Sequence, residues 1–392
     1  MIDKDSKYFS LSGDIPIGGP STWHIIDWDQ RRVVSVTMDG EQDDESLAIE
    51  HFSRHSDPLS PDIHRIYVSH NDEIKSTYTD SKNDPTCCVH YPSLHDACPP
   101  EEVQTVRRDK LEELERLGPN ADLFAYSPCI EGSAKKVVFK YYFLWQSPKL
   151  VVDELEGRIV GFTSNYVPGG NLEENKSRVF KLKWLQQLIK VVDELNLGHG
   201  IAHQDIAPRN LLINESTDSI MLFDFNFAAR INCPSSGEGE SYVEERNDIK
   251  GVIFTIYEII TQDDSLRSIP HEDQNLDNIE LKWVKHPGVK LDNPVESYQL
   301  MLKEWRERRE RDSRSGNVPR LIDWPAMPKP PQKTISLKTV HGQTTSVTVD
   351  NWYERRQDIR GRGDKVLNWE RPPQRLLDNG IRVLSTGEIP NC

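Results

Sequence analysis

The sequence lacks any apolar run long enough to cross a membrane. Its longest apolar stretch, residues 251–260, contains Tyr257 and Glu258 and is much shorter than the roughly 20 residues that span a bilayer. The first residues, Met1 to Asp5, lead into no apolar segment of the kind found in secretion signals. We therefore expect a soluble protein that is not secreted, in the cytoplasm or nucleus, whose 6 cysteines are free thiols.

Positive charge is also in short supply. The chain has 48 Lys and Arg against 63 Asp and Glu, a net charge of −15 at pH 7. Such a chain repels phosphate backbones and anionic lipids, so we expect no nucleic-acid partner and no membrane partner. The length of 392 residues allows one to three domains.

Cysteine and histidine gather in one short segment, which suggests a zinc site. The residues are Cys87, Cys88, His90, His95 and Cys98. Their spacing matches no zinc pattern, and prolines on both sides are typical of a loop. We favour the loop and expect no metal here.

The most informative motif lies between residues 203 and 226. His203, Asp205 and Asn210 have the spacing H-x-D-x-x-x-x-N, and Asp224 opens the triplet D-F-N. Phosphoryl transfer needs a carboxylate that accepts a proton. It also needs ligands for a divalent cation, which an amide and a second carboxylate can supply.

The surrounding pattern places this motif on definite elements. Apolar runs at 211–213 and 220–223 flank the polar segment 214–219, which predicts a β-hairpin between Asn210 and Asp224. Apolar residues at helical spacing predict a helix over 178–196, and the run 248–261 predicts a long buried helix.

Together these features resemble the catalytic loop and metal-binding segment of the protein kinase superfamily. The amino-acid sequence of the loop resembles that of uncharacterised fungal protein-kinase-domain proteins. The resemblance covers roughly residues 110–310. It implies an α+β, bilobal protein-kinase-like fold with a truncated β-rich small lobe and a mainly helical large lobe. It also implies that Asp205 is the catalytic base and that Asn210 and Asp224 bind Mg²⁺.

Further site residues follow from the same resemblance. Val137–Lys140 is similar to the kinase strand whose lysine binds ATP phosphates, so Lys140 is a catalytic and ATP-binding candidate. Residues 159–170 resemble the hinge between the lobes, where backbone groups near Asn165 and Val167 would bind adenine. Gly118 would lie in the phosphate loop. Asp248 would brace the catalytic loop.

The resemblance divides the chain into four parts. These are an N-terminal extension of unknown function (1–105), the small lobe (106–165), the large lobe (166–318) and a Pro-containing tail (319–392). Within them we expect strands at 31–38 and 65–68, a helix over 109–117, a helix over 298–311 with an exposed charge run, and a hairpin of 334–340 with 344–349. Residues 367–373 would pack on the large lobe.

Several departures from the kinase pattern bear on activity. The chain between Lys140 and Tyr166 must hold two strands, and the remainder is too short for the αC helix, whose glutamate pairs with the kinase lysine. Glu154 or Glu156 could replace that glutamate. The phosphate loop has one glycine where kinases have three, so we expect weaker ATP binding.

The protein-substrate side departs further. Gln204 replaces the arginine that pairs with a phosphorylated activation loop, so we expect no control by such phosphorylation. The segment from Asp224 to Asp248 is short and has no A-P-E triplet.

We thus expect a phosphotransferase that uses ATP and Mg²⁺ on a hydroxyl acceptor, in the first instance a protein. A catalytically dead pseudokinase or scaffold, and a small-molecule kinase, are the alternatives.

Overall fold

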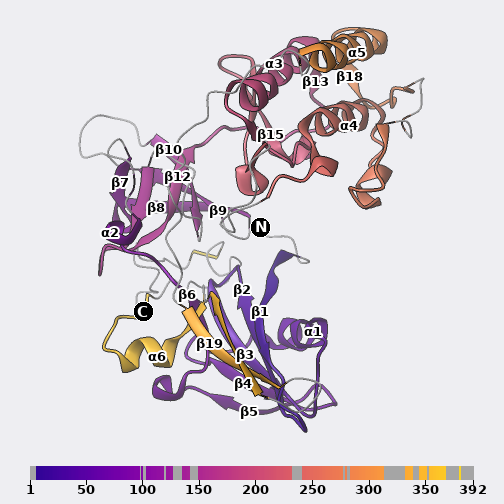
Figure 1. Ribbon diagram of the computed structural model, residues 1–392. Coiled ribbons are helices and arrows are strands. Elements are labelled where there is room, and N and C mark those ends of the chain that lie inside the picture. Colours follow the sequence, from indigo (N-terminus) through magenta and orange to yellow (C-terminus); the bar gives the residue numbers. More distant parts are fainter. Residues whose placement is uncertain are drawn as a thin grey trace. The chain divides into compact units, whose positions relative to one another are not determined.

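The computed structural model forms two compact units, residues 1–166 with 325–392 and residues 167–324. Strands dominate the first unit and α-helices the second (Figure 1), which agrees with the predicted α+β class. The residues described are 6–97, 99, 103–118, 121–126, 135–141, 149–231, 241–276, 279, 283–312, 332–338, 344–350, 353–367 and 379–380. No helix among them is long and apolar enough to cross a membrane.

The first unit begins with a five-stranded sheet in the order β1-β2-β3-β4-β5. Its strands are β1 (Tyr8–Asp14), β2 (Ser21–Asp27), β3 (Arg32–Met38), β4 (Arg65–Val68) and β5 (Ile74–Tyr78). Helix α1 (Glu45–His55) connects β3 to the parallel strand β4 and buries Ala48 and Phe52 in the core of the sheet. The strands predicted at 31–38 and 65–68 are confirmed as β3 and β4.

A six-stranded sheet follows, in the order β7-β11-β12-β10-β9-β8. Its strands are β7 (Gln104–Arg107), β8 (Leu111–Gly118), β9 (Ala121–Tyr126), β10 (Lys135–Tyr141), β11 (Lys149–Val152) and β12 (Ile159–Asn165). The helix predicted over 109–117 is wrong, because this segment pairs with β9 as strand β8. Its glutamates favour a helix locally, but a strand partner outweighs local propensity.

The expected loss of the αC helix agrees with the strand bounds. Strand β10 ends at Tyr141 and β11 begins at Lys149, so the chain between them is shorter than the roughly 11 residues of a three-turn helix. In the part of residues 135–165 that the structure describes, there is no helix.

The glutamates considered as replacements are engaged elsewhere. The Glu154 carboxylate accepts hydrogen bonds from Arg108, and Glu156 accepts one from Arg158 at 2.8 Å. Both lie in the turn between β11 and β12 that the sequence indicated. Each carboxylate is thus engaged by an arginine, and substitution of the αC glutamate by either residue stays a prediction.

The cysteine- and histidine-rich segment is not a loop throughout. It contains strand β6 (Cys87–Val89) and the short helix α2 (Leu94–Ala97), which follow the 3₁₀ turn Ser81–Asn83. Among the described residues no group of three or more potential metal ligands occurs, and Cys98 lies outside them. Burial raises the pKa of the Cys88 thiol to about 11.

The tail packs on the first unit rather than on the large lobe. Strand β21 (Tyr353–Arg355) pairs with β6 and leads into helix α6 (Arg356–Gly361). Leu367 is buried in the cluster of Val106 and Phe139, which corrects the expectation for residues 367–373 as far as they are described. The predicted hairpin is confirmed as β19 (Gln332–Lys338) and β20 (Thr344–Asp350), and residues 339–343 lie outside the described part.

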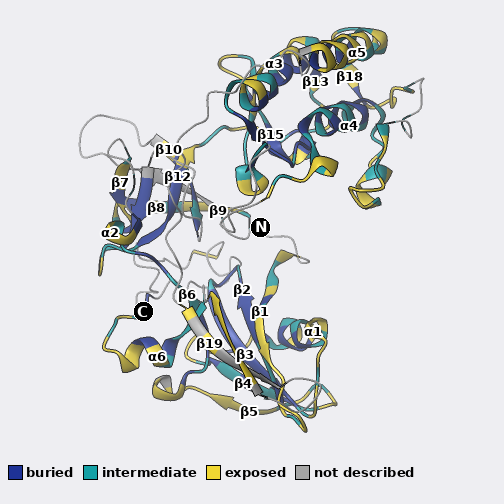
Figure 2. Ribbon diagram, in the orientation of Figure 1, coloured by how far each residue is buried: buried dark blue, intermediate teal, exposed yellow. Residues whose placement is uncertain are grey.

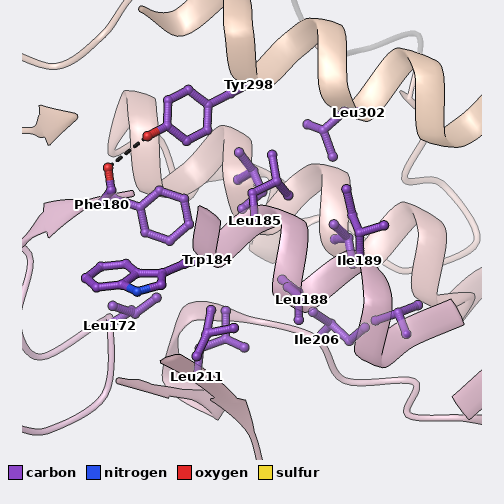
Figure 3. Packing of buried hydrophobic residues seen from close by; sticks show 14 of the residues in the cluster. Leu172, Phe180, Trp184, Leu185, Leu188, Ile189, Ile206, Leu211, Tyr298 and Leu302 are labelled. Carbon is purple, nitrogen blue, oxygen red and sulfur yellow. Dashed lines mark hydrogen bonds between the residues drawn. The ribbon is translucent and has the colours of Figure 1, made fainter. Parts of the chain in front are cut away.

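The second unit is built on helices α3 (Leu182–Asp193), α4 (Asp248–Thr261) and α5 (Val295–Asp312). Its short strands pair as β13 (Val179–Phe180) with β18 (Lys290–Leu291), β14 (Ile201–Ala202) with β17 (Ala229–Arg230), and β15 (Leu211–Asn214) with β16 (Ser219–Leu222). Leu185 and Leu188 of α3 pack with Tyr298 and Leu302 of α5 in one buried cluster (Figure 3). Helix α4 is mostly covered, whereas α5 has a long exposed face (Figure 2).

The three predicted helices of this unit are confirmed with two changes. Helix α3 starts later than expected because Val179 and Phe180 form strand β13, and its end continues as a π-helical turn, Glu194–Gly198. The charge run of α5 is not wholly exposed. Arg309 is buried and donates hydrogen bonds to Asp193 and Asn196, so it ties α5 to the end of α3.

The buried tyrosine of this cluster gives a test of the packing. The Tyr298 hydroxyl lies 2.8 Å from the Phe180 carbonyl oxygen and 2.7 Å from Asp292 Oδ1. Tyr298→Phe leaves both acceptors without this donor, and we expect a loss of about 1–2 kcal/mol in unfolding free energy, measured by urea denaturation. Tyr242→Phe, whose hydroxyl meets the exposed Glu244, is the matched control and should change little. Equal losses in both variants would contradict the assignment.

A buried histidine predicts a pH effect in the first unit. Burial, then the charge of Arg355, lowers the pKa of His24 from 6.5 to about 4. Below pH 6.5 the unfolded chain binds a proton that the folded chain does not accept until about pH 4, so stability falls through this window. We expect His24→Gln to remove about 2 kcal/mol of the stability loss between pH 7 and 5. Parallel pH curves for the two proteins would refute this role.

Candidate functional site

The centre of the candidate site is the buried carboxylate of Asp248 at the first residue of α4. Its Oδ2 accepts hydrogen bonds from the His203 backbone N–H and from Asn196 Nδ2, each at 2.8 Å. Its Oδ1 accepts one from the Gln204 N–H at 2.8 Å. Helix α4 thus fixes the backbone immediately before Asp205, as the kinase resemblance implied.

Asp205 and Asn210 are joined directly. Asn210 Nδ2 donates to the Asp205 carbonyl oxygen at 2.7 Å and to Oδ2 at 2.8 Å. Arg209 donates to the other carboxylate oxygen, Oδ1. The loop residues of the H-x-D-x-x-x-x-N motif therefore form one hydrogen-bonded group, with the Asp205 side chain 13% exposed.

The predicted hairpin is confirmed and brings Asn210 and Asp224 to the same end. Leu211 pairs with Leu222, and the Phe223 N–H donates to the Asn210 carbonyl oxygen at 3.1 Å. Asp224 has φ 66° and ψ 67°, a left-handed conformation that is uncommon outside glycine. Such strain is typical of functional positions.

The donor set at this end fits Mg²⁺. Because Asn210 Nδ2 is engaged with Asp205, its amide oxygen is the atom left to face a ligand, and Asp224 adds a carboxylate. Magnesium prefers such oxygen ligands and keeps several waters. Asn210 and Asp224 are therefore the residues that would hold the ion.

His203 lies among the carboxylates of this group. Its Nε2–H donates to the Phe223 carbonyl oxygen at 2.9 Å, and its ring meets Phe225 edge to face at 4.7 Å. Burial lowers the pKa of His203, while the charges of Asp248, Asp205 and Asp224 act to raise it. Because Nδ1 accepts a hydrogen bond from the Asp205 N–H at 3.3 Å, the imidazole is neutral, and it links the loop 203–210 to the segment that carries Asp224.

Gln204 has a structural role that motif spacing did not reveal. It is 4% exposed, and its amide nitrogen donates to the carbonyl oxygens of Phe227 at 2.7 Å and Ser241 at 3.2 Å. Its amide oxygen accepts from the Val243 N–H at 2.6 Å. A neutral side chain thus binds both described ends of the segment after Asp224, and residues 232–240 lie outside the described part.

The remaining predicted residues lie around the six-stranded sheet. Lys140 of β10 pairs with Ala121 of β9, which in turn pairs with Gly118 of β8, so Lys140 and Gly118 share one row across the strands. Asn165 ends β12 opposite Val137. Val167 opens the second unit. The phosphate-binding roles of Lys140 and Gly118 stay predictions.

The comparisons with known proteins find matches among solved structures alone. No protein-family model matches the chain, and no curated protein matches it. Among solved structures, the kinase PK-1 of Cydia pomonella granulovirus is similar over 42% of this chain and 77% of its own, with 17% identity and a TM-score of 0.30. An alignment at that score carries no argument about function, for which the contacts above are the evidence.

The brace at α4 can be tested directly. Asp248→Asn replaces one of the two acceptor oxygens with an amide NH₂ group that faces other hydrogen-bond donors. We therefore expect the free energy of unfolding to fall by about 2–3 kcal/mol. The amides of His203 and Gln204 should exchange hydrogen faster. The exposed Asp264→Asn is the control and should leave both quantities near the wild-type values. Unchanged exchange at His203 and Gln204 would rule out the brace.

Proposed function

We propose that the protein is an ATP-dependent phosphotransferase that moves the γ-phosphate to a hydroxyl acceptor. The main support is that Asp205 and Asn210 are hydrogen-bonded to each other. The β15–β16 hairpin then connects Asn210 to Asp224. Phosphoryl transfer depends on placing few charged groups closely, and this group supplies a base and two metal ligands.

Each residue has a stated task in this proposal. An acceptor hydroxyl would donate its hydrogen bond to Asp205, whose carboxylate has lone pairs beyond those used by Arg209 and Asn210. Magnesium bound by Asn210 and Asp224 would neutralise phosphate charge. Lys140 would contact the ATP phosphates beside Gly118, and backbone groups near Asn165 and Val167 would bind adenine.

A catalytically dead pseudokinase is the second candidate, and one observation favours it. The chain between β10 and β11 is too short for a helix that would supply a glutamate to Lys140. Glu154 and Glu156 are bound to arginines. The helix that carries the glutamate of the kinase ion pair therefore has no room in this part of the chain.

Thermal unfolding with MgATP tests the nucleotide site. A ligand at about 100 times its Kd adds roughly 2.7 kcal/mol, which raises the Tm by several degrees. We expect this Mg²⁺-dependent shift in the wild type and its loss in Asp224→Asn. Glu296→Gln, an exposed change on α5, is the control and should keep the shift. No shift in the wild type would refute nucleotide binding.

Transfer from labelled ATP tests Asp205. Asp205→Asn should keep the MgATP shift and lose transfer about 10²–10⁴-fold, the usual contribution of a general base. Residual activity equal to the wild type would remove Asp205 from the mechanism. ATP binding without any transfer by the wild type would establish the pseudokinase.

A further inference from the structure

A cavity of about 290 Å³ lies in the second unit between the catalytic loop and one face of α4. Asp205 and Arg209 line it on one side, and residues of α4 from Lys250 to Glu258 line it on another. Its volume is near the lower limit for pockets that hold small molecules. A space of this size beside the proposed base is suited to a small acceptor.

The wall between loop and helix is tightly fitted. The Thr255 hydroxyl donates to the Ile206 carbonyl oxygen at 2.8 Å. A Cβ at Gly251 would lie 3.2 Å from Ile206 Cβ, so glycine allows this close approach. The cavity is therefore held in place by the same helix that braces Asp205.

Two cations on the cavity wall have no carboxylate partner among the described residues. The Arg246 guanidinium lies 4.3 Å from the centroid of the Phe227 ring, and its Nε is buried without a hydrogen bond. Lys250 is 9% exposed, and its Nζ donates to the carbonyl oxygens of His271 at 2.8 Å and Gln274 at 3.4 Å.

Other cations of the cavity are neutralised. Arg209 pairs with Asp205, and Arg267 pairs with Glu258 and Glu173. Lys250 is partly compensated, because burial lowers its pKa while the charges of Glu245, Glu244 and Glu272 act to raise it. Arg246 forms no salt bridge with the described residues, and a cation of this kind favours an anion in the cavity.

The two cations lie near the proposed base. Burial lowers the pKa of His271, the charges of Arg246 and Lys250 lower it further, and the charge of Asp205 opposes them. Arg246, Lys250 and Asp205 line the same cavity as this imidazole. A ligand anchored by Arg246 would have its nearby groups within reach of the catalytic loop.

We propose that this cavity binds the phosphate acceptor, and that the acceptor is a small hydroxyl compound bearing a phosphate or carboxylate group. Arg246 and Lys250 hold the anionic group, and the hydroxyl donates to Asp205. Transfer itself rests on the proposed function. The hydroxyl oxygen bonds to the γ-phosphorus of ATP, the bond from that phosphorus to the bridging oxygen breaks, ADP leaves, and the hydroxyl proton passes to Asp205.

Binding is tested first, without ATP. Inorganic phosphate is titrated calorimetrically, at matched ionic strength, into the wild type, Arg246→Gln and Arg306→Gln. Arg306 is an exposed arginine of α5 and serves as the control. We expect a Kd at least tenfold weaker in Arg246→Gln alone, and partial retention in Arg246→Lys, which keeps the charge. Equal affinity in all four proteins would overturn the anion site.

Transfer is tested second, from labelled MgATP to glycerol 3-phosphate, glycerate, glycerol and an acidic serine peptide. Arg246-dependent transfer to one of the two anionic compounds, but not to glycerol, supports the proposal and identifies phosphate or carboxylate as the group. Arg246-dependent transfer to the peptide alone overturns the small-molecule class.

Transfer that Asp205→Asn abolishes but Arg246→Gln leaves unchanged overturns the acceptor site and keeps the proposed function. Arg246-dependent phosphate binding without any transfer keeps the site and refutes the proposed function.

Discussion

The carboxylate of Asp248 is the constraint on which the second unit depends. It accepts hydrogen bonds from the consecutive backbone N–H groups of His203 and Gln204 and from the Asn196 amide in the turn after α3. If this carboxylate were removed, each of the three buried donors would lose its hydrogen-bond acceptor, and each loss would cost free energy of folding. The position of Asp205 is therefore set from behind, by the start of a helix whose other residues form the core.

Gln204 extends this constraint to the segment after Asp224. The nitrogen and oxygen of its side-chain amide bind the backbone of Phe227, Ser241 and Val243, so a neutral side chain holds both described ends of this segment. These hydrogen bonds form without phosphorylation of the chain, and because Gln204 is uncharged their strength depends little on salt concentration. The backbone on both sides of residues 232–240 is therefore held without a charged partner.

The sequence predicted elements that depend on local patterns, and it missed contacts between residues far apart along the chain. The hairpin before Asp224 and the helix 248–261 follow from short apolar patterns, and both are confirmed. The strand β8 was predicted as a helix because its partner β9 is invisible to local propensity. The contacts of Gln204 and the buried Arg309 depend on residues far along the chain, which spacing cannot indicate.

Helix α4 has three roles on three faces. Its N-terminal Asp248 positions the loop, its apolar residues such as Ile256 fill the core, and Lys250 and Glu258 line the cavity. Gly251 and Thr255 of α4 therefore fix one wall of the cavity against Ile206, next to Asp205. Phe227 and Arg246, from the segment between Asp224 and α4, form another part of the lining, so the shape of the cavity depends on this segment as well as on the helix.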